Sequence, residues 1–431
     1  MQSDRYQIKN VELWTNTGIR HGVSVLVENG ILVKISDQTE AHASGVDTID
    51  GHGVVLMPAG VDPQVHLRVP GQPEKETALS GLEAARAGGI AAVLTMPNTN
   101  PILDDVVSLN LAKKELDPAT AKTGVQVLYS AAITKGQKGK QAVDYQVLAD
   151  WGVAAFTDDG VGVLSDELMA TAFDASEKTG LPILQHAEMP GHGGVLAPGP
   201  VQLKQAVKAY PEAAEVDMVR RDLELLRRYP MARYHVLHAS AARTVDLVKQ
   251  AKKEGYRASV EVTPHHLWFT ADDITPENSS FKMNPPLRSK EDRLALQEGL
   301  RLGDIDFVST DHAPHEAEVK TSKFKTAAYG TVGLETSLPV LLSLYNKGVL
   351  SFSDVIRVFS KNPASFLGID DRYGDIEIGR PFNAVLVDKE QVQTVSLEFL
   401  KGKSKNSCFL GSRLHGKILM TCFEKHIHSF L

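Results

Sequence analysis

The chain has 431 residues, of which 42% are hydrophobic and 23% are charged, and its formal net charge is -7. This composition is that of a folded globular protein, which excludes a disordered chain and gives no general attraction to nucleic acid or anionic membranes. We therefore expect a small-molecule partner, and the length favours one large domain with a smaller one.

The chain contains two cysteines, Cys408 and Cys422. Such a low cysteine content excludes a disulfide framework and a cysteine-rich zinc site. The first ten residues, MQSDRYQIKN, lack the apolar run of a signal peptide, and no uninterrupted apolar stretch reaches the roughly 18 residues of a membrane span. We expect a cytoplasmic protein that does not enter a membrane.

The first elements, from Tyr6 to about Met57, alternate apolar and polar residues in short runs, with a turn signal at Asn29 and Gly30. This alternation predicts a small antiparallel β layer. After Pro58 the pattern changes to short apolar runs separated by helical stretches. That change is typical of a parallel sheet with crossover helices.

Eight apolar runs follow one another along the chain, and helical stretches lie between several of them. The apolar runs cover residues 54–66, 91–96, 126–132, 153–156, 182–186, 234–238, 258–262 and 306–310. The clearest helical stretches cover residues 75–87, 166–178, 214–228 and 290–300. Eight such units predict an α/β fold, a (β/α)8 TIM-like barrel over residues 58–373.

Strand-like character returns after the barrel, over residues 374–388. We expect residues 374–431 to join residues 1–57 in a small β-sandwich domain built from both ends of the chain. His426 and His428, which form a His-x-His pattern near the C-terminus, are expected in a solvated tail.

Polar residues follow nearly every apolar run of the predicted barrel. Barrel enzymes build their sites at the carboxyl ends of the strands, and zinc prefers imidazole nitrogen and carboxylate oxygen. For any single residue, a buried structural histidine or a helix-capping aspartate is the simpler interpretation. Five such residues at the same topological position favour a metal site. The candidate ligands are His66, Asp159, His186, His238 and Asp311.

Two residues near these ligands are candidates for the chemistry. A bound metal lowers the pKa of its water and polarises an amide carbonyl, so Asp311 is the natural general base that accepts the water proton and returns it to the leaving nitrogen. Arg68, two residues beyond His66, offers a bidentate fork for a substrate carboxylate. A surface salt bridge is the alternative role of Arg68.

Seven motifs together resemble those of a known family, the type I bacterial dihydroorotases of the amidohydrolase superfamily. The resemblance rests on their order and approximate spacing and spans roughly residues 6–390, fading beyond about Leu400. The motifs are DPQVHLRVPG (62–71), MPNTNP (96–101), FTDDG (156–160), QHAE (185–188), EVTPHHL (261–267), NPPLR (284–288) and STDHAPH (309–315).

In that family a two-zinc site hydrolyses dihydroorotate or closes N-carbamoyl-L-aspartate, the third step of pyrimidine biosynthesis. The resemblance implies that Asp159 bridges two metals, that His186 and His238 complete one site, and that His66 and Asp311 contribute to the other. The implied substrate-binding residues are Arg68, Asn98, Asn284, His315, Tyr329 and Gly330.

The fourth strand separates this family from close relatives. Hydantoinases resemble the same barrel but carry a carboxylated lysine there, where this chain has FTDDG. Dihydroorotase is therefore favoured over a hydantoinase or an allantoinase. Of the two aspartates, Asp159 is preferred to Asp158 because its separation from His186 resembles the family spacing.

The first strand departs from the family, because Gln64 stands where the resemblance implies the first histidine of His-x-His. An amide oxygen is a weaker zinc ligand than imidazole, so we expect one firmly bound zinc and a second site weakened by Gln64. Three interpretations follow: an active enzyme with one firm metal, a catalytically inactive partner of aspartate carbamoyltransferase, or an introduced substitution. We expect a homodimer and an association with aspartate carbamoyltransferase.

Overall fold

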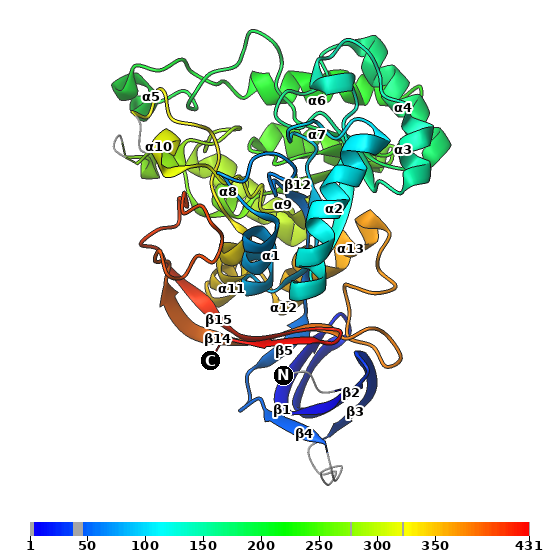
Figure 1. Cartoon of the computed structure of the whole chain (residues 1–431). Helices are drawn as coiled ribbons and strands as arrows, with labels where there is room; N and C mark the ends of the chain where they lie inside the picture. The colour runs from blue at the N-terminus through cyan, green and yellow to red at the C-terminus, as the bar shows by residue number, and fades with distance from the viewer. Residues whose placement is uncertain (1–3, 38–45, 276–277, 321–322, 431) are drawn as a thin grey trace.

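A computed structural model describes residues 4–37, 46–275, 278–320 and 323–430. These residues form a parallel barrel surrounded by helices and a second, largely antiparallel sheet that lies against one end of the barrel (Figure 1). The first and last strands of the chain both belong to the second sheet.

The barrel is an eight-stranded sheet in which each strand pairs in parallel with the next one along the chain. A parallel bridge between Val65 and His312, with a 2.9 Å hydrogen bond from the His66 amide to the His312 carbonyl, brings the last strand back to the first. The predicted barrel is therefore confirmed. Its strands are β6 (Gly60–Val65), β7 (Ile90–Thr95), β8 (Gln126–Ala131), β9 (Ala155–Thr157), β10 (Ile183–Gln185), β11 (Tyr234–Val236), β12 (Ala258–Val262) and β13 (Phe307–Val308).

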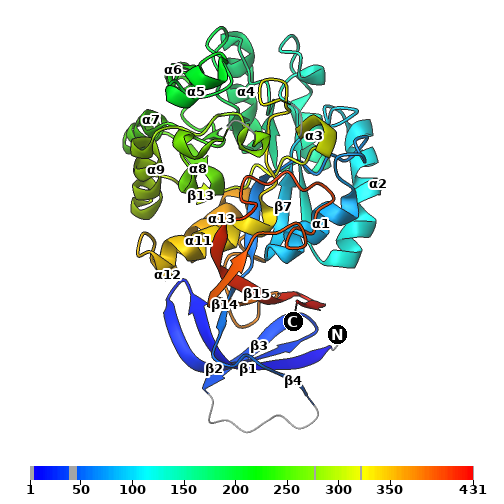
Figure 2. The ribbon, with the colours of Figure 1, turned by 90° about the vertical axis from the view of Figure 1, so that its left-hand side faces the viewer.

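Helices surround the barrel (Figure 2). Their apolar faces are buried in the core that they share with it. Several begin at side-chain caps, as at Ser165 and Ser289, and the first begins later than predicted because Thr77 caps it. The longer helices are α1 (Ala78–Ala87), α2 (Val106–Thr123), α3 (Tyr145–Trp151), α4 (Asp166–Thr179), α6 (Ala213–Leu226), α7 (Ala242–Lys253), α9 (Lys290–Leu302) and α11 (Ser337–Asn346). Shorter ones are α5 (Pro200–Gln205), α8 (Pro264–Trp268), α10 (Ala317–Lys320), α12 (Phe352–Ile356) and α13 (Asn362–Leu367).

The second sheet joins both ends of the chain in one hydrogen-bonded layer, in the order β16-β15-β14-β5-β1-β2-β3, with β4 paired to β1. Its central connection is the antiparallel pairing of β5 with β14, where Val385 lies opposite Met57. The predicted shared β layer is thus confirmed. The strands are β1 (Arg5–Thr15), β2 (Gly18–Glu28), β3 (Ile31–Asp37), β4 (Asp47–Asp50), β5 (Val55–Pro58), β14 (Asn383–Thr394), β15 (Arg413–Phe423) and β16 (His426–Ser429).

The end of the chain differs from the expected solvated tail. His426 and His428 lie in β16, where they pair with Phe423 and Thr421 of β15. The preceding residues Glu424 and Lys425 form a tight turn, with Glu424 at a φ of 52°. Backbone pairing to an existing sheet edge therefore orders a segment whose composition alone indicated a loose end.

The two parts of the molecule share an apolar contact around Trp14 of the second sheet. The Trp14 ring is fully buried and lies 5.2 Å from the ring of Tyr345 and 5.8 Å from that of Phe352, both from the helical side. Aromatic rings bury a large apolar area, so this contact holds the sheet against the barrel. None of the described helices combines the length and apolar character needed to cross a bilayer.

Candidate metal centre and substrate pocket

The candidate ligands lie where the barrel strands end. His66 is one residue beyond β6, Asp159 two beyond β9, His186 one beyond β10, and His238 two beyond β11. Asp311 follows β13 by three residues. Because the carboxyl ends of the strands meet at one rim of the barrel, these five side chains, far apart in the sequence, come together in space.

Asp159, His186 and His238 form the first ligand group. Asp159 Oδ1 lies 3.5 Å from His186 Nδ1 and 3.6 Å from His238 Nε2, and the two ring nitrogens are 2.9 Å apart. All three side chains are buried, and their potential ligand atoms lie within 4.8 Å of one another. Two imidazoles and one carboxylate at this spacing fit a divalent cation such as zinc.

His66, Asp159 and Asp311 form the second ligand group. His66 Nε2 lies 3.2 Å from Asp159 Oδ2 and 3.0 Å from Asp311 Oδ1. Asp159 therefore directs one carboxylate oxygen toward each group. A carboxylate in this position can join two cations that share a site, which is the arrangement of a two-metal centre.

The electrostatics of the cluster favour positive charge between these groups. Burial opposes the charge on His66, yet the Asp159 and Asp311 carboxylates raise its pKa to about 9. His186 is likewise buried, and Asp159 and Glu188 raise its pKa to about 9. The three imidazoles outweigh burial at Asp159 and hold its pKa well below the usual value. A bound cation would take the place of these protons.

Asp158 and Asp159 point to different places although they are adjacent. Asp158 accepts hydrogen bonds from the amides of Ile133 and Thr134, at 2.8 and 3.1 Å, and from the Thr134 hydroxyl. Asp158 therefore fixes the loop after β8, and Asp159 is the member of the pair that faces the histidines.

Gln64 is fully buried within β6, next to the ligand groups. Its Nε2 lies 3.4 Å from Asp159 Oδ1, and its Oε1 has no hydrogen-bond partner among the described residues. A buried amide oxygen without a partner is costly, and a cation beside Asp159 would satisfy it after rotation of the amide. The donor set therefore fits two cations. At position 64 it offers a cation only the neutral amide oxygen of Gln64.

Three site residues adopt left-handed backbone conformations that are uncommon outside glycine. The φ angles are 60° at Arg68, 35° at His238 and 48° at Asp311. Such conformations cost free energy and persist only where the surrounding structure enforces them, which is frequent at functional sites. They turn the chain sharply at the strand ends.

A pocket of about 170 Å³ opens over the ligand groups, and five of the six predicted substrate-binding residues line it: Arg68, Asn98, Asn284, Tyr329 and Gly330. Arg68 is buried, its Nε donates to the Pro314 carbonyl at 3.3 Å, and burial lowers its pKa to about 10. The guanidinium keeps its charge at neutral pH and is anchored through one nitrogen. Its two terminal nitrogens can therefore present a fork to an anion.

The two asparagines contact the ligand groups directly. Asn98 Oδ1 lies 2.9 Å from His66 Nδ1, and Asn284 Nδ2 lies 3.3 Å from His186 Nε2 and donates to Glu188 Oε2 at 2.8 Å. Glu188 Oε2 lies 3.4 Å from His186 Nε2. Asn98 thus orients the His66 ring, as partners of metal-binding histidines usually do.

His315 is the sixth predicted substrate residue, and it does not line the pocket itself. It lies beside Gly330, where an added Cβ would meet His315 Cδ2 at 3.5 Å. Burial lowers its pKa to about 3, so its ring is neutral. From this position His315 backs the pocket wall.

Sequence reasoning missed two residues of the site, Glu188 and Asn406. Asn406 accepts from the His315 amide at 3.1 Å and donates to the carbonyls of Ala313 and Gly330 at 3.0 and 3.2 Å. It lies beyond Leu400, in an irregular segment with no apolar periodicity that would have marked it. Glu188 stood within a recognised motif, QHAE, but nothing in the sequence showed its contact with Asn284.

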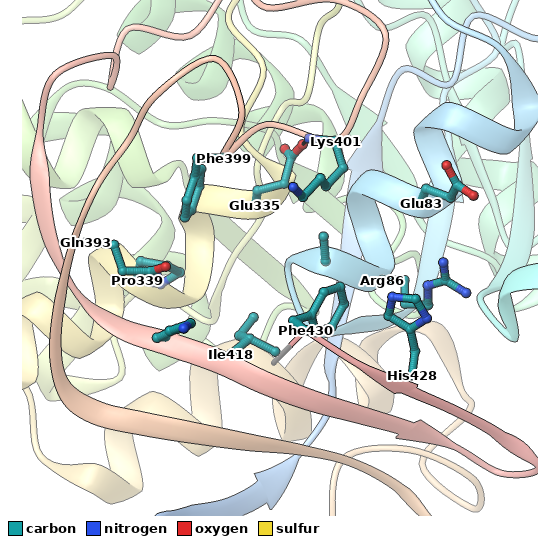
Figure 3. Close-up of a pocket in the computed structure, with 12 residues that line it drawn as sticks. Glu83, Arg86, Glu335, Pro339, Gln393, Phe399, Lys401, Ile418, His428 and Phe430 are labelled. Atoms are coloured by element: carbon teal, nitrogen blue, oxygen red, sulfur yellow. Dashed lines mark hydrogen bonds between the residues drawn. The ribbon is translucent and has the colours of Figure 1, made fainter. Parts of the chain in front are cut away.

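A larger cleft, of about 540 Å³, lies elsewhere, between α1, the start of α11 and the β15–β16 edge of the second sheet (Figure 3). It is lined by charges of both signs, including Arg86, Lys401 and Glu335, and by the rings of Phe399 and Phe430. It shares no lining residue with the pocket over the ligand groups. The smaller pocket is lined by both ligand groups and is therefore the candidate active site.

Comparisons with known proteins identify the family of this chain. Residues 55–415 match the model of the amidohydrolase family. A dihydroorotase of Anaplasma phagocytophilum (strain HZ) is 39% identical over 89% of this chain and 85% of its own, and one of Staphylococcus epidermidis (strain RP62A) is 37% identical over 97% and 98%. The resemblance thus extends beyond the stretch that the motifs cover.

Solved structures share the fold. The L-hydantoinase (dihydropyrimidinase) of Arthrobacter aurescens superposes with a TM-score of 0.84 at 27% identity, over 96% of this chain and 94% of that one. A D-hydantoinase superposes with a TM-score of 0.83 at 21% identity, over 98% and 94%, and indicates the fold alone. From the family match and the curated relatives, the chain belongs to the dihydroorotases of the amidohydrolase family.

Proposed function

We propose that this chain is a metal-dependent dihydroorotase that reversibly hydrolyses dihydroorotate to N-carbamoyl-L-aspartate. The observation that carries the proposal is Asp159, which directs one oxygen toward His186 and His238 and the other toward His66. The dihydroorotase names of the relatives support the same substrate.

Zinc is the proposed metal, because its preferred ligands are the nitrogen and oxygen donors gathered here. Asp159, His186 and His238 would hold the firm ion, and His66, Asp159 and Asp311 would hold the second. Zinc bound there would activate water and polarise the ring amide carbonyl. We expect the second group to hold its ion less firmly, because the family resemblance implies an imidazole ligand at position 64, where Gln64 offers a neutral amide.

Asp311 is the proposed catalytic residue for proton transfer. Its carboxylate lies at the pocket, with Oδ1 3.0 Å from His66 Nε2. It would accept a proton from the attacking water and deliver it to the ring nitrogen as the amide bond breaks. The same group then serves both directions of a reversible reaction.

Arg68 is the proposed residue for recognition of the substrate carboxylate. Its buried guanidinium would pair with the carboxylate, and Asn98, Asn284, Tyr329 and Gly330 would surround the ring, with His315 behind Gly330. A hydantoin lacks this carboxylate. Discrimination through Arg68 therefore separates dihydroorotase from hydantoinase or allantoinase activity, the alternative among cyclic amide hydrolases.

A second candidate function comes from Gln64. Loss of one imidazole ligand would suit a catalytically inactive partner of aspartate carbamoyltransferase. We favour activity, because a scaffold has no need for a carboxylate-binding Arg68 beside Asp311. We further propose a cytoplasmic homodimer that can associate with aspartate carbamoyltransferase, with residues 1–57 and 374–431 as the small domain and 58–373 as the barrel domain.

The deciding experiment is an assay of the purified chain with dihydroorotate, without and with added zinc. Turnover that depends on metal and disappears in Asp311→Asn supports the enzyme. A wild-type chain that turns over no dihydroorotate at any zinc loading, yet binds aspartate carbamoyltransferase, would establish the scaffold. Hydantoin as the preferred substrate would establish the other hydrolase.

A further inference from the structure

Two lysines beside the substrate pocket are buried without a carboxylate partner among the described residues. Lys282 is 2% exposed and Lys320 is 4% exposed. Lysine is rarely buried unless its charge is compensated. In both cases backbone carbonyl oxygens provide the compensation.

The two ammonium groups donate hydrogen bonds to backbone carbonyls of residues 325–330, and Lys320 also binds the carbonyl of Lys282. Lys320 Nζ donates to the carbonyls of Lys282, Ala328 and Gly330, at 3.3, 2.9 and 2.9 Å. Lys282 Nζ donates to the carbonyls of Lys325 and Ala327, at 2.9 and 2.7 Å. An ammonium has three donors and no acceptor, so Lys320 uses its whole capacity here.

The segment held in this way ends in a wall of the substrate pocket, formed by Tyr329 and Gly330. Lys282 Nζ lies 4.4 Å from the centre of the Tyr329 ring, and the Lys282 carbonyl accepts from the Gly330 amide at 2.8 Å. Gly330 has a φ of 121°, and an added Cβ would lie 2.6 Å from Ala313 Cβ. The wall is therefore closely packed at Gly330, while the half-exposed Tyr329 is held through the lysine contacts.

We infer that Lys320, together with Lys282, is a positioning residue whose ammonium group holds the Tyr329–Gly330 wall of the substrate pocket in place. The expected effect on substrate rests on the proposed dihydroorotase function. The holding of the wall does not depend on that function. Neither lysine touches the ligand groups, so the role is separate from metal binding.

The protonation of Lys320 bears on this role. Burial lowers the pKa of Lys320 to about 7. The charge of Lys282 also lowers this pKa, Cys408 raises it, and the neutral ring of His315 is a further neighbour. A lysine with a lowered pKa is charged below that value and neutral above it. The neutral amine has two N–H donors for three carbonyls, so the wall loosens as the pH rises through about 7.

Amide hydrogen exchange of residues 323–330 tests the holding of the wall directly. Protection is corrected for the intrinsic exchange rate and compared with that of α9. In the wild-type chain we expect it to fall about tenfold between pH 6 and pH 8.5, which corresponds to the loss of one charge-assisted hydrogen bond. Lys320→Met should show the loosened state at both pH values. The matched control is Lys323→Met, which removes an exposed lysine from the same segment.

Steady-state kinetics at pH 6 test the consequence for substrate. We expect Lys320→Met to raise KM for dihydroorotate about tenfold with kcat changed less than about threefold, because the wall contacts substrate before and during the reaction. Lys323→Met should match the wild type. Zinc content should be equal in all three proteins.

Each outcome decides between the alternatives. Protection of residues 323–330 that is independent of pH in the wild-type chain overturns the inference, and this arm needs no variant to fold. Lost protection with an unchanged KM overturns the positioning role and leaves a structural one. A wild-type chain that turns over no dihydroorotate contradicts the proposed function, while the exchange result still decides whether Lys320 holds the wall.

Discussion

Gln64 donates a hydrogen bond from Nε2 to Asp159 Oδ1 at 3.4 Å, and both side chains are nearly fully buried. The residue that departs from the family pattern is thus in contact with the carboxylate that joins the two ligand groups. Because an amide is neutral and binds zinc weakly, we expect Gln64 to limit how firmly a second metal is held.

We predict that Gln64→His will add a second firmly held zinc. Elemental analysis after extensive dialysis should rise from about one to about two zinc ions per chain, since a restored imidazole strengthens metal binding roughly 10- to 100-fold, as changes around metal ligands commonly do. Gln64→Leu, which removes the amide without adding a ligand, should stay near one. Two firm ions in the wild-type chain would contradict this account.

The two adjacent aspartates should behave differently. Asp159→Ala removes an oxygen from both ligand groups, so the chain should lose zinc while keeping its fold by circular dichroism. Asp158→Ala should keep zinc and lose about 1–3 kcal/mol of the free energy of unfolding, because the amides of Ile133 and Thr134 lose their acceptor. Zinc loss in the Asp158 variant instead would reverse the assignment.

Arg68 should affect substrate recognition without affecting metal. We expect Arg68→Ala to lower kcat/KM for dihydroorotate roughly 10- to 100-fold, the loss of a charge-assisted bidentate contact, with unchanged zinc content. Dihydrouracil, the same ring without the carboxylate, provides the control. If both substrates lost activity equally, Arg68 would have a structural role in place of recognition.

Asn406 should matter although it lies outside the recognised motifs. Asn406→Ala leaves the carbonyl of Ala313 and the amide of His315 without their partner, so we expect a loss of about 1–3 kcal/mol in stability and a higher KM. Asn346→Ala is a matched control, because its amide binds the Leu342 and Lys389 carbonyls away from the pocket. The control should lose stability alone, measured by urea unfolding and steady-state kinetics.

Removal of the metal should destabilise the folded chain. The buried carboxylate of Asp159 and its histidines would then depend on protons for charge balance. Treatment with a zinc chelator should lower the midpoint of thermal unfolding, and added zinc should restore it, because an ion that binds only the folded state stabilises it. An unchanged midpoint would show that the ligand groups hold no metal in solution.

The sequence by itself determined the barrel and the rim at which chemistry occurs. Successive apolar runs with helical stretches between them report burial, which is readable from the local periodicity of the sequence. His66, His186 and His238 each stand at the end of such a run, so their meeting at one rim follows from parallel strand topology.

Only the tertiary structure decided how the side chains of the site are oriented and which contacts support them. The directions of Asp158 and Asp159 differ because the loop after β8 binds one of them, and no local pattern encodes that loop's position. The contacts of Asn406 and Lys320 are with backbone carbonyls of distant segments, which composition and spacing do not record. Packing between segments remote in the sequence fixes these residues, whereas periodicity reports only which face of each segment is buried.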